Sequence, residues 1–175
     1  MDSVEPDQNI IIQISQSFKD IKVYLPRLKK LVKTTCSHFS NKKTSAGGTK
    51  YEISIAIVDD AQFRELNSRY LKRQTTSDCL SFDLSDNGSD SSKLFEIVVN
   101  GEIAVKQAHL RGYSAEAELA LYITHGLLHN LGYDDSTEEK ALKMHNIEDK
   151  ILQQLGYGIV YNRALAVREH KTQKE

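Results

Sequence analysis

Two histidines four residues apart, His125 and His129, are followed six residues later by an aspartate, Asp135. Side chains with this spacing lie on the same face of a helix, one turn apart, so two imidazoles there can bind one divalent metal ion. Such a helix would stop at Gly132, because glycine tolerates the left-handed conformation that ends helices. The chain can then turn back and offer Asp135, or its neighbour Asp134, as a third ligand. Three protein ligands with one open position are typical of catalytic zinc sites, so the segment predicts a metal-dependent hydrolase with one zinc ion per chain.

The helix predicted to carry both histidines, residues 115–131, is largely apolar and should therefore be well buried. Buried imidazoles need polar partners, so the alternative to a metal site is a pair of histidines that hydrogen-bond to core carboxylates or carbonyls. Zinc proteases of the HExxH type place their general base, a glutamate, directly after the first histidine, and that position is Gly126 in this chain. The pattern therefore favours a metal site and disfavours a protease of that type.

The run HGLLHNLGYDD at residues 125–135 resembles the signature H-G-x-L-H-x-x-G-Y-D-H of the YbeY family of bacterial metal-dependent endoribonucleases, which act in ribosomal RNA maturation. Three upstream segments also resemble segments of that family, namely LNSRY at 66–70 (L-N-x-x-Y), SDCLSF at 77–82 (T-D-V-L-S-F) and GEIAV at 101–105 (the G-D-I-x-I strand). Their order and spacing agree with the family from about residue 51 to residue 156.

This resemblance implies a function and a set of partners. The function is that of a zinc-dependent, single-strand-specific endoribonuclease acting on ribosomal RNA precursors, in 16S rRNA 3′-end maturation and in ribosome quality control. The partners would be RNA and the ribosome or its small subunit, with neither DNA nor a membrane among them. The implied metal ligands are His125, His129 and Asp135. Two other functions remain as alternatives, a zinc peptidase of the HxxxHxxGxxD type and a non-catalytic ribosome-assembly factor with a structural metal.

Three positions depart from the family pattern, of which the mildest is Ser77, where the family has a threonine and the hydroxyl is kept. Asp135 stands where the family has a third histidine, and because aspartate also binds zinc through oxygen, a His/His/Asp site is expected. Leu71 stands where the family often has an arginine linked to activity, directly after the tyrosine of L-N-x-x-Y. Arg69, Lys72 and Arg73 are the nearby cations that could replace it.

Residues beside the expected metal site have candidate roles in the hydrolysis of a phosphodiester bond. A metal ion can lower the pKa of a bound water to roughly 7 and can neutralise charge in the transition state. Arg73 is the candidate for holding the phosphate, and Ser81 is the candidate for lining the cleft. Asp134, Glu102 and Asp78 are the candidates for the general base, with little to choose among them, and Asp134 is taken as the prediction.

Two further residues could support the ligands. Glu118 lies seven residues before His125 and therefore on the same helix face, from which it could orient a metal-bound histidine. A salt bridge is an equally expected role for Glu118. His145 lies in the next predicted helix, where we expect an ordinary surface or core histidine in preference to a fourth ligand.

Composition limits the classes of protein to which the chain can belong. With 175 residues, 27% of them charged and 39% hydrophobic, the chain is typical of one soluble globular domain. Its net charge of −1 means that RNA binding must depend on a local basic patch, for which residues 69–73 and 27–33 are the candidates. Either stretch could instead be the solvated face of an amphipathic helix, which is the favoured interpretation for residues 27–33. Two cysteines are too few for a disulfide framework, and neither a membrane-spanning run nor a secretory signal is recognisable. A cytoplasmic location is therefore expected.

Hydrophobic periodicity predicts the elements that must position these residues. Strands are predicted at 10–14, 51–58 and 79–84, and helices at 25–39, 60–71, 106–112 and 115–131, with a last helix that starts at a capping box, residues 136–139, and stops at Gly156. Residues 95–105 hold two apolar runs that meet at Asn100-Gly101, which predicts either a tight hairpin turn or the start of the family's strand. The expected fold is α+β, a single domain at residues 9–160 with a small mixed sheet of about four strands packed with helices and a zincin-like metal site on a central helix. A flexible tail is expected at residues 1–8 and a disordered one at 161–175.

Overall fold

The computed structural model describes residues 9–39, 48–86, 91–158 and 160. Along them lie strand β1 (Ile10–Gln16), helix α1 (Leu25–Phe39), strand β2 (Lys50–Val58), helix α2 (Asp60–Leu71), strands β3 (Cys79–Asp83) and β4 (Ser92–Asn100), and helices α3 (Gly101–Arg111), α4 (Ala115–Asn130) and α5 (Glu138–Gln154). Both predicted tails lie outside the described residues. Within the described ranges, every helix is too short or too polar to cross a membrane.

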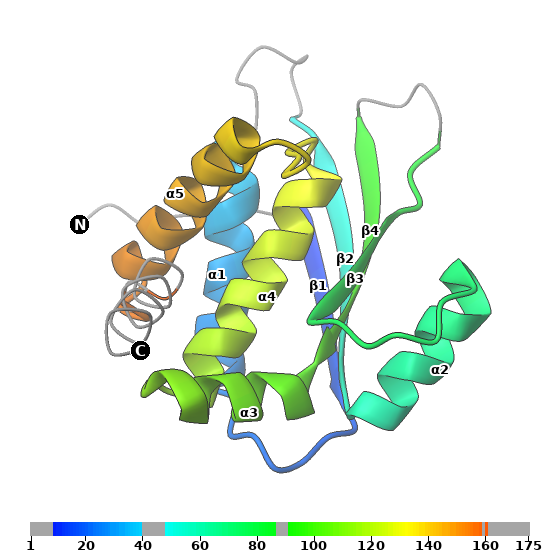
Figure 1. Ribbon diagram of the computed structural model, residues 1–175. Coiled ribbons are helices and arrows are strands. Elements are labelled where there is room, and N and C mark those ends of the chain that lie inside the picture. Colours follow the sequence, from blue (N-terminus) through cyan, green and yellow to red (C-terminus); the bar gives the residue numbers. More distant parts are fainter. Residues whose placement is uncertain (1–8, 40–47, 87–90, 159, 161–175) are drawn as a thin grey trace.

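The strands form one mixed sheet in the order β1-β2-β4-β3 (Figure 1). β1, β2 and β4 run parallel, and β3 pairs antiparallel with β4 at the edge of the sheet. Side chains alternate between the two faces of a strand, and on β2 the buried Ile53, Ile55 and Ile57 mark the face turned to the main core. The predicted α+β fold, with a small mixed sheet packed with helices, is confirmed.

Helices α1, α4 and α5 cover one face of the sheet, and α2 lies against the other face (Figure 1). Helix α4 is the central one, because 11 of its 16 residues are buried where it packs against α1, α5 and the strands β3 and β4. On the opposite face, Phe63 of α2 packs with Val58 and Leu80 in a second, smaller hydrophobic cluster. The predicted histidine helix is therefore held from several sides by the core.

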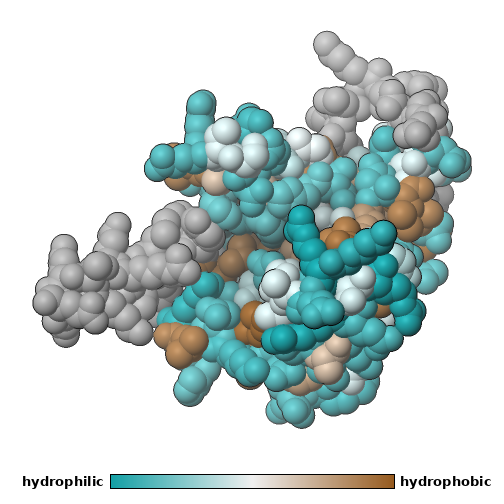
Figure 2. All heavy atoms as spheres, turned by 45° about the vertical axis from the view of Figure 1, so that its right-hand side comes forward, coloured by the Kyte–Doolittle hydropathy of each residue, from teal (hydrophilic) through white to brown (hydrophobic). Residues whose placement is uncertain are grey.

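The face of the molecule in Figure 2 is largely hydrophilic, with hydrophobic side chains in several separate places. Between α2 and the sheet lies a groove of about 660 Å³, whose lining includes Ala56, Leu66, Tyr70, Phe82 and Val98. Leu66 and Tyr70 belong to α2 and the other three to the sheet face on which α2 packs, whereas the histidine helix covers the other face. The groove is therefore separate from the candidate metal ligands.

Local capping signals set where the two helices of the metal segment begin. Ser114 caps α4, as its position before the apolar run predicts, by accepting a hydrogen bond of 3.1 Å from a first-turn amide. Helix α5 begins one residue later than the capping box at 136–139 predicts, because the hydroxyl of Thr137 accepts the amide of Lys140. Ser136 donates instead to the carboxylate of Asp134, so its hydroxyl serves the loop before the helix.

The segment GEIAV at residues 101–105 is helical, so both predictions for the Asn100-Gly101 step were wrong. Asn100 ends β4, and its side-chain oxygen accepts the amide of Ile103 at 3.1 Å, which makes it the N-cap of α3. Asparagine caps helices as readily as it forms turns, so the dipeptide alone does not decide between them. The buried Gly101, Ala104 and Ala108 follow helical spacing. The helix predicted at 106–112 is the second half of α3.

Candidate metal centre

The three predicted ligands converge at the end of α4. The Nε2 atoms of His125 and His129 lie 3.0 Å apart. After the helix ends, Gly132 has a φ of 95° and the chain turns back. This turn brings Asp135 to the histidines, with Oδ2 at 3.7 Å from Nε2 of His125 and Oδ1 at 3.8 Å from Nε2 of His129. Two imidazole nitrogens and a carboxylate at this spacing fit a three-ligand metal site.

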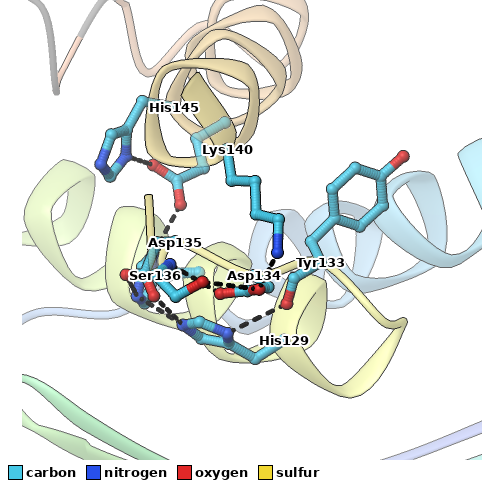
Figure 3. A network of polar contacts seen from close by, with 9 residues as sticks. His129, Tyr133, Asp134, Asp135, Ser136, Lys140 and His145 are labelled. Carbon is cyan, nitrogen blue, oxygen red and sulfur yellow. Dashed lines mark hydrogen bonds and ion pairs between the residues drawn. The ribbon is translucent and has the colours of Figure 1, made fainter. Parts of the chain in front are cut away.

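Each imidazole has a hydrogen-bond partner at its second ring nitrogen. Nδ1 of His129 lies 3.2 Å from the carbonyl oxygen of Tyr133 (Figure 3). Nδ1 of His125 lies 2.7 Å from Oε1 of Glu148, a fully buried carboxylate on α5. A carbonyl and an ionised carboxylate only accept, so both Nδ1 atoms carry a proton, and in the neutral imidazoles both Nε2 atoms present a lone pair. This is the arrangement that metal-bound histidines usually have.

The ionisation of the site is set by its acidic groups. Burial lowers the pKa of His125, but the hydrogen bond and charge of Glu148, together with the charges of Asp78 and Asp135, outweigh burial and raise that pKa above its ordinary value. Burial raises the pKa of Glu148, but hydrogen bonds from His125 and His145 outweigh it, so that pKa is lowered. The acidic groups around His125 therefore favour positive charge at this position.

Asp134, the predicted general base, is bound within the loop that leads to Asp135. Its carboxylate accepts Lys140 Nζ at 2.6 Å, the amide of Ser136 at 2.6 Å and the hydroxyl of Ser136 at 2.8 Å (Figure 3). The hydrogen bond from Lys140 and those from Ser136 hold the pKa of Asp134 well below its usual range. A carboxylate with so low a pKa is a weak base, and its contacts stabilise the turn that carries the third ligand.

Ser81 lies on β3 against the histidine helix, where Gly126 allows close packing. A Cβ built on Gly126 would lie 3.2 Å from Cγ2 of Ile97, 3.5 Å from Cβ of Ser81 and 3.7 Å from Sγ of Cys79. The position at which an HExxH protease carries its base is therefore pressed against the sheet. A longer side chain there would clash with β3 and β4, which explains in physical terms why the chain has glycine between its two histidines.

Arg73, the predicted phosphate-binding residue, is exposed in the loop between α2 and β3. This loop is anchored by Asn67, whose side-chain amide donates to the carbonyl of Thr75 at 2.6 Å. In the part of the chain that the structure describes, no hydrogen bond or ion pair joins Arg73 to the three candidate ligands. Of the other cations in the basic stretch, Arg69 forms an exposed ion pair with Glu65 at 3.0 Å. The loop leads into β3, the strand that packs against α4.

The match to known proteins covers the whole of this site. The sequence model of the family described as Endoribonuclease YbeY matches residues 13–156. The chain belongs to the endoribonuclease YbeY family. An endoribonuclease YbeY of Syntrophomonas wolfei is 41% identical over 110 residues, which are 58% of this chain and 70% of that protein. An endoribonuclease YbeY of Coxiella burnetii is 31% identical over 150 residues, which are 85% of this chain and 95% of that protein. The solution structure of a Thermotoga maritima protein shares the fold, with a TM-score of 0.51 and 21% identity, over 82% of this chain and 91% of that one.

Membership of the YbeY family confirms the resemblance that the histidine segment first indicated. Two of the departures from the family pattern, Asp135 and Leu71, have definite places in the structure. Asp135 reaches the histidines with its carboxylate, so the replacement of a histidine keeps a ligand atom in position. Leu71 is the last residue of α2 and is 43% exposed, close along the chain to the exposed Lys72 and Arg73.

Sequence reasoning missed Glu148 and assigned a possible supporting role to Glu118 instead. Glu118 is fully buried and pairs with Arg111 at 2.8 Å, so it serves the junction of α3 and α4. Helical spacing could have indicated that Glu148 is buried, because it places this residue on the same side of α5 as the buried Met144, Ile151 and Leu152. A carboxylate on the apolar side of an amphipathic helix needs a buried partner, and that requirement was the available signal.

Proposed function

We propose that this YbeY family protein is a zinc-dependent endoribonuclease specific for single-stranded RNA, with one zinc ion held by His125, His129 and Asp135. The family description supports ribonuclease activity. The observation that carries the metal is the convergence of two imidazole nitrogens, 3.0 Å apart, on the carboxylate of Asp135. Three protein ligands leave a coordination position open, as catalytic rather than structural zinc sites do.

Zinc in a site of this kind supplies Lewis acidity, which makes a water molecule more acidic and stabilises negative charge on phosphoryl oxygens. The residues of the chain orient the ligands and bind the substrate around it. Arg73 is proposed to hold a phosphate, and Ser81 to line the cleft beside the histidine helix. Asp134 stays a prediction as general base. Asp78 is the better placed alternative, because its charge lies close enough to His125 to raise the pKa of that imidazole.

The same hypothesis extends to the cellular role. We propose that the substrate is a ribosomal RNA precursor, that the activity serves 16S rRNA 3′-end maturation and ribosome quality control, and that the protein works in the cytoplasm with the ribosome or its small subunit. The net charge of −1 gives no general attraction to nucleic acid, so binding must depend on local cations such as those at residues 69–73. Affinity for RNA should therefore fall steeply with added salt although the whole molecule is nearly neutral.

The first experiment measures metal content by elemental mass spectrometry on the wild type and on His129→Ala, both purified without chelator. The matched control is His109→Ala, which removes an exposed histidine from α3. The proposal predicts about one zinc per chain in the wild type and in the control, as a three-ligand site requires, and loss of zinc in His129→Ala. Absence of metal from the wild type, even after zinc is added back, would refute the proposal of a zinc-dependent hydrolase.

Cleavage assays then separate the three functions that the metal segment allows. Single-stranded RNA, double-stranded RNA and casein are each incubated with the zinc-loaded wild type, with and without chelator. Cleavage of single-stranded RNA alone, abolished by chelator, supports the proposal. Cleavage of casein would favour the peptidase, which the packing of Gly126 against Ile97 argues against. Co-sedimentation with ribosomes without cleavage of any substrate would favour an assembly factor with a structural metal.

A further inference from the structure

A single buried carboxylate joins the candidate metal ligand His125 to a second histidine outside the ligand set. Glu148 of α5 is fully buried, with Oε1 at 2.7 Å from Nδ1 of His125 and Oε2 at 2.7 Å from Nδ1 of His145. Each oxygen thus has its own imidazole N–H. Burial without such partners would strongly disfavour the charged form, so the two imidazole N–H groups allow the carboxylate to stay ionised.

The two imidazoles on this carboxylate have different surroundings. The rings of His125 and His145 are nearly parallel, with centroids 6.1 Å apart and an interplanar angle of 12°. On the other side of its ring, the Nε2 atom of His125 faces His129 and Asp135. His145 lies one turn before Glu148 on α5, with its Nδ1 atom directed at that carboxylate. The order of contacts is therefore His145, Glu148, His125 and then the candidate metal position.

These contacts determine which nitrogen of His125 is free. An ionised carboxylate accepts only, so Glu148 requires a proton on Nδ1 of His125 and leaves Nε2 with its lone pair. Nε2 is the atom that faces the other two ligands. Without Glu148 the imidazole could take the opposite tautomer or rotate, and the lone pair would no longer be presented to a metal ion.

We propose that Glu148 is the positioning residue for His125 and that His145 in turn holds Glu148, so that α5 sets the metal affinity of the site without giving it a ligand. This inference rests on the proposed zinc site at His125, His129 and Asp135. It assigns to the cluster of His125, His145 and Glu148 a hydrogen-bonding role, although these three residues could by their spacing also hold an ion. The pair of α5 residues acts through His125 and does not touch the substrate.

The test compares Glu148→Gln, His145→Phe and His145→Gln with the wild type. A glutamine at position 148 can donate as well as accept, so it no longer imposes one tautomer on His125. Outer partners of metal-bound histidines are worth about 10–100-fold in metal affinity, so Glu148→Gln should weaken the zinc Kd by about that factor. His145→Phe should weaken zinc binding by less, because the hydrogen bond between Glu148 and His125 remains. His145→Gln can still donate a hydrogen bond to Glu148, so its zinc affinity should be close to that of the wild type. Asn146→Ala, an exposed change on the same helix, is the control.

Three readouts do not depend on catalysis. Zinc Kd is measured by chelator competition, the ligand field by the visible spectrum of the cobalt-substituted protein, and the His125 tautomer by nitrogen NMR of the metal-free protein at a pH where imidazoles are neutral. Mixed tautomers in Glu148→Gln, against a single Nδ1-protonated form in the wild type, would support the proposal. If Glu148→Gln folds poorly, His145→Phe and His145→Gln still provide the comparison.

The outcomes separate this inference from the proposed function. An unchanged zinc Kd and tautomer in Glu148→Gln would overturn it, and so would a second metal ion per chain that is lost in His145→Phe, since Glu148 and His145 would then be ligands. A wild type that binds one zinc and shows the predicted losses, but cleaves no RNA, would sustain the positioning role and refute the ribonuclease. A wild type without metal would overturn both.

Discussion

Replacing Glu118 by leucine tests whether this buried carboxylate holds the fold or the metal ligands. Glu118 is fully buried and Oε1 accepts Arg111 Nη1 at 2.8 Å, while the side chain of Arg111 is 21% exposed. The hydroxyl of Tyr113 donates to the second oxygen. Removing one partner of a buried ion pair leaves the other charge unpaired and costs about 3–5 kcal/mol. In a protein of this size each kcal/mol lowers Tm by about 2–4 °C, so we expect a fall of about 10 °C.

The same variant should leave the zinc affinity unchanged within about twofold, because the contacts of Glu118 are structural and Glu148 orients His125. Urea unfolding of the metal-free protein and chelator competition measure the two quantities separately. The double variant Arg111→Met with Glu118→Leu should recover most of the stability, since well-packed apolar residues replace buried ion pairs at little cost, within about 1–2 kcal/mol. Glu65→Gln, which removes an exposed pair at 3.0 Å, is the control and should cost under about 1 kcal/mol. Loss of zinc with an unchanged unfolding midpoint would refute the reasoning and give Glu118 the orienting role.

Two further predictions concern the loop before α5 and the stability of the protein in alkali. Asp134→Asn and Lys140→Gln should each weaken zinc binding by about tenfold, because each removes a contact that supports the loop carrying Asp135. RNA cleavage at saturating zinc should stay near that of the wild type. If cleavage is lost at full zinc occupancy in Asp134→Asn alone, Asp134 is instead the general base. Burial raises the pKa of Tyr113 to about 12, so the stability that this phenol contributes is fully present below its ordinary pKa near 10 and is lost as the pH rises toward 12. Urea unfolding across that range should show the loss in the wild type and a smaller one in Tyr113→Phe, and equal losses in both would assign the effect to other groups.

The convergence of His125, His129 and Asp135 was predictable from the sequence because it depends on local geometry. His125 and His129 are one helical turn apart in any α-helix, and Gly132 marks the turn that returns Asp135 to them. The same reason made other elements recognisable, because hydrophobic periodicity and helix caps depend only on residues close together in the chain. These elements are the strands predicted at 51–58 and 79–84 and the helices that precede and follow the turn at Gly132. Where two local signals competed, as at Asn100-Gly101, neighbours were not enough: that dipeptide caps a helix here because α3 packs its small residues in the core.

The orientation of His125 was decided by tertiary structure, whereas His129 has a local partner in the carbonyl of Tyr133. Glu148 is 23 residues from His125, on another helix, and only the packing of α5 beside α4 brings its carboxylate to 2.7 Å from the imidazole. The same holds for Glu118, which pairs with Arg111 of α3 and not with its own helix face. Sequence spacing determines which side chains share one helix face, but it does not contain the distance between two helices. The residues that could bind a metal ion were therefore recognisable in the sequence, whereas the buried carboxylate that contacts His125 reaches it only because α5 packs beside α4.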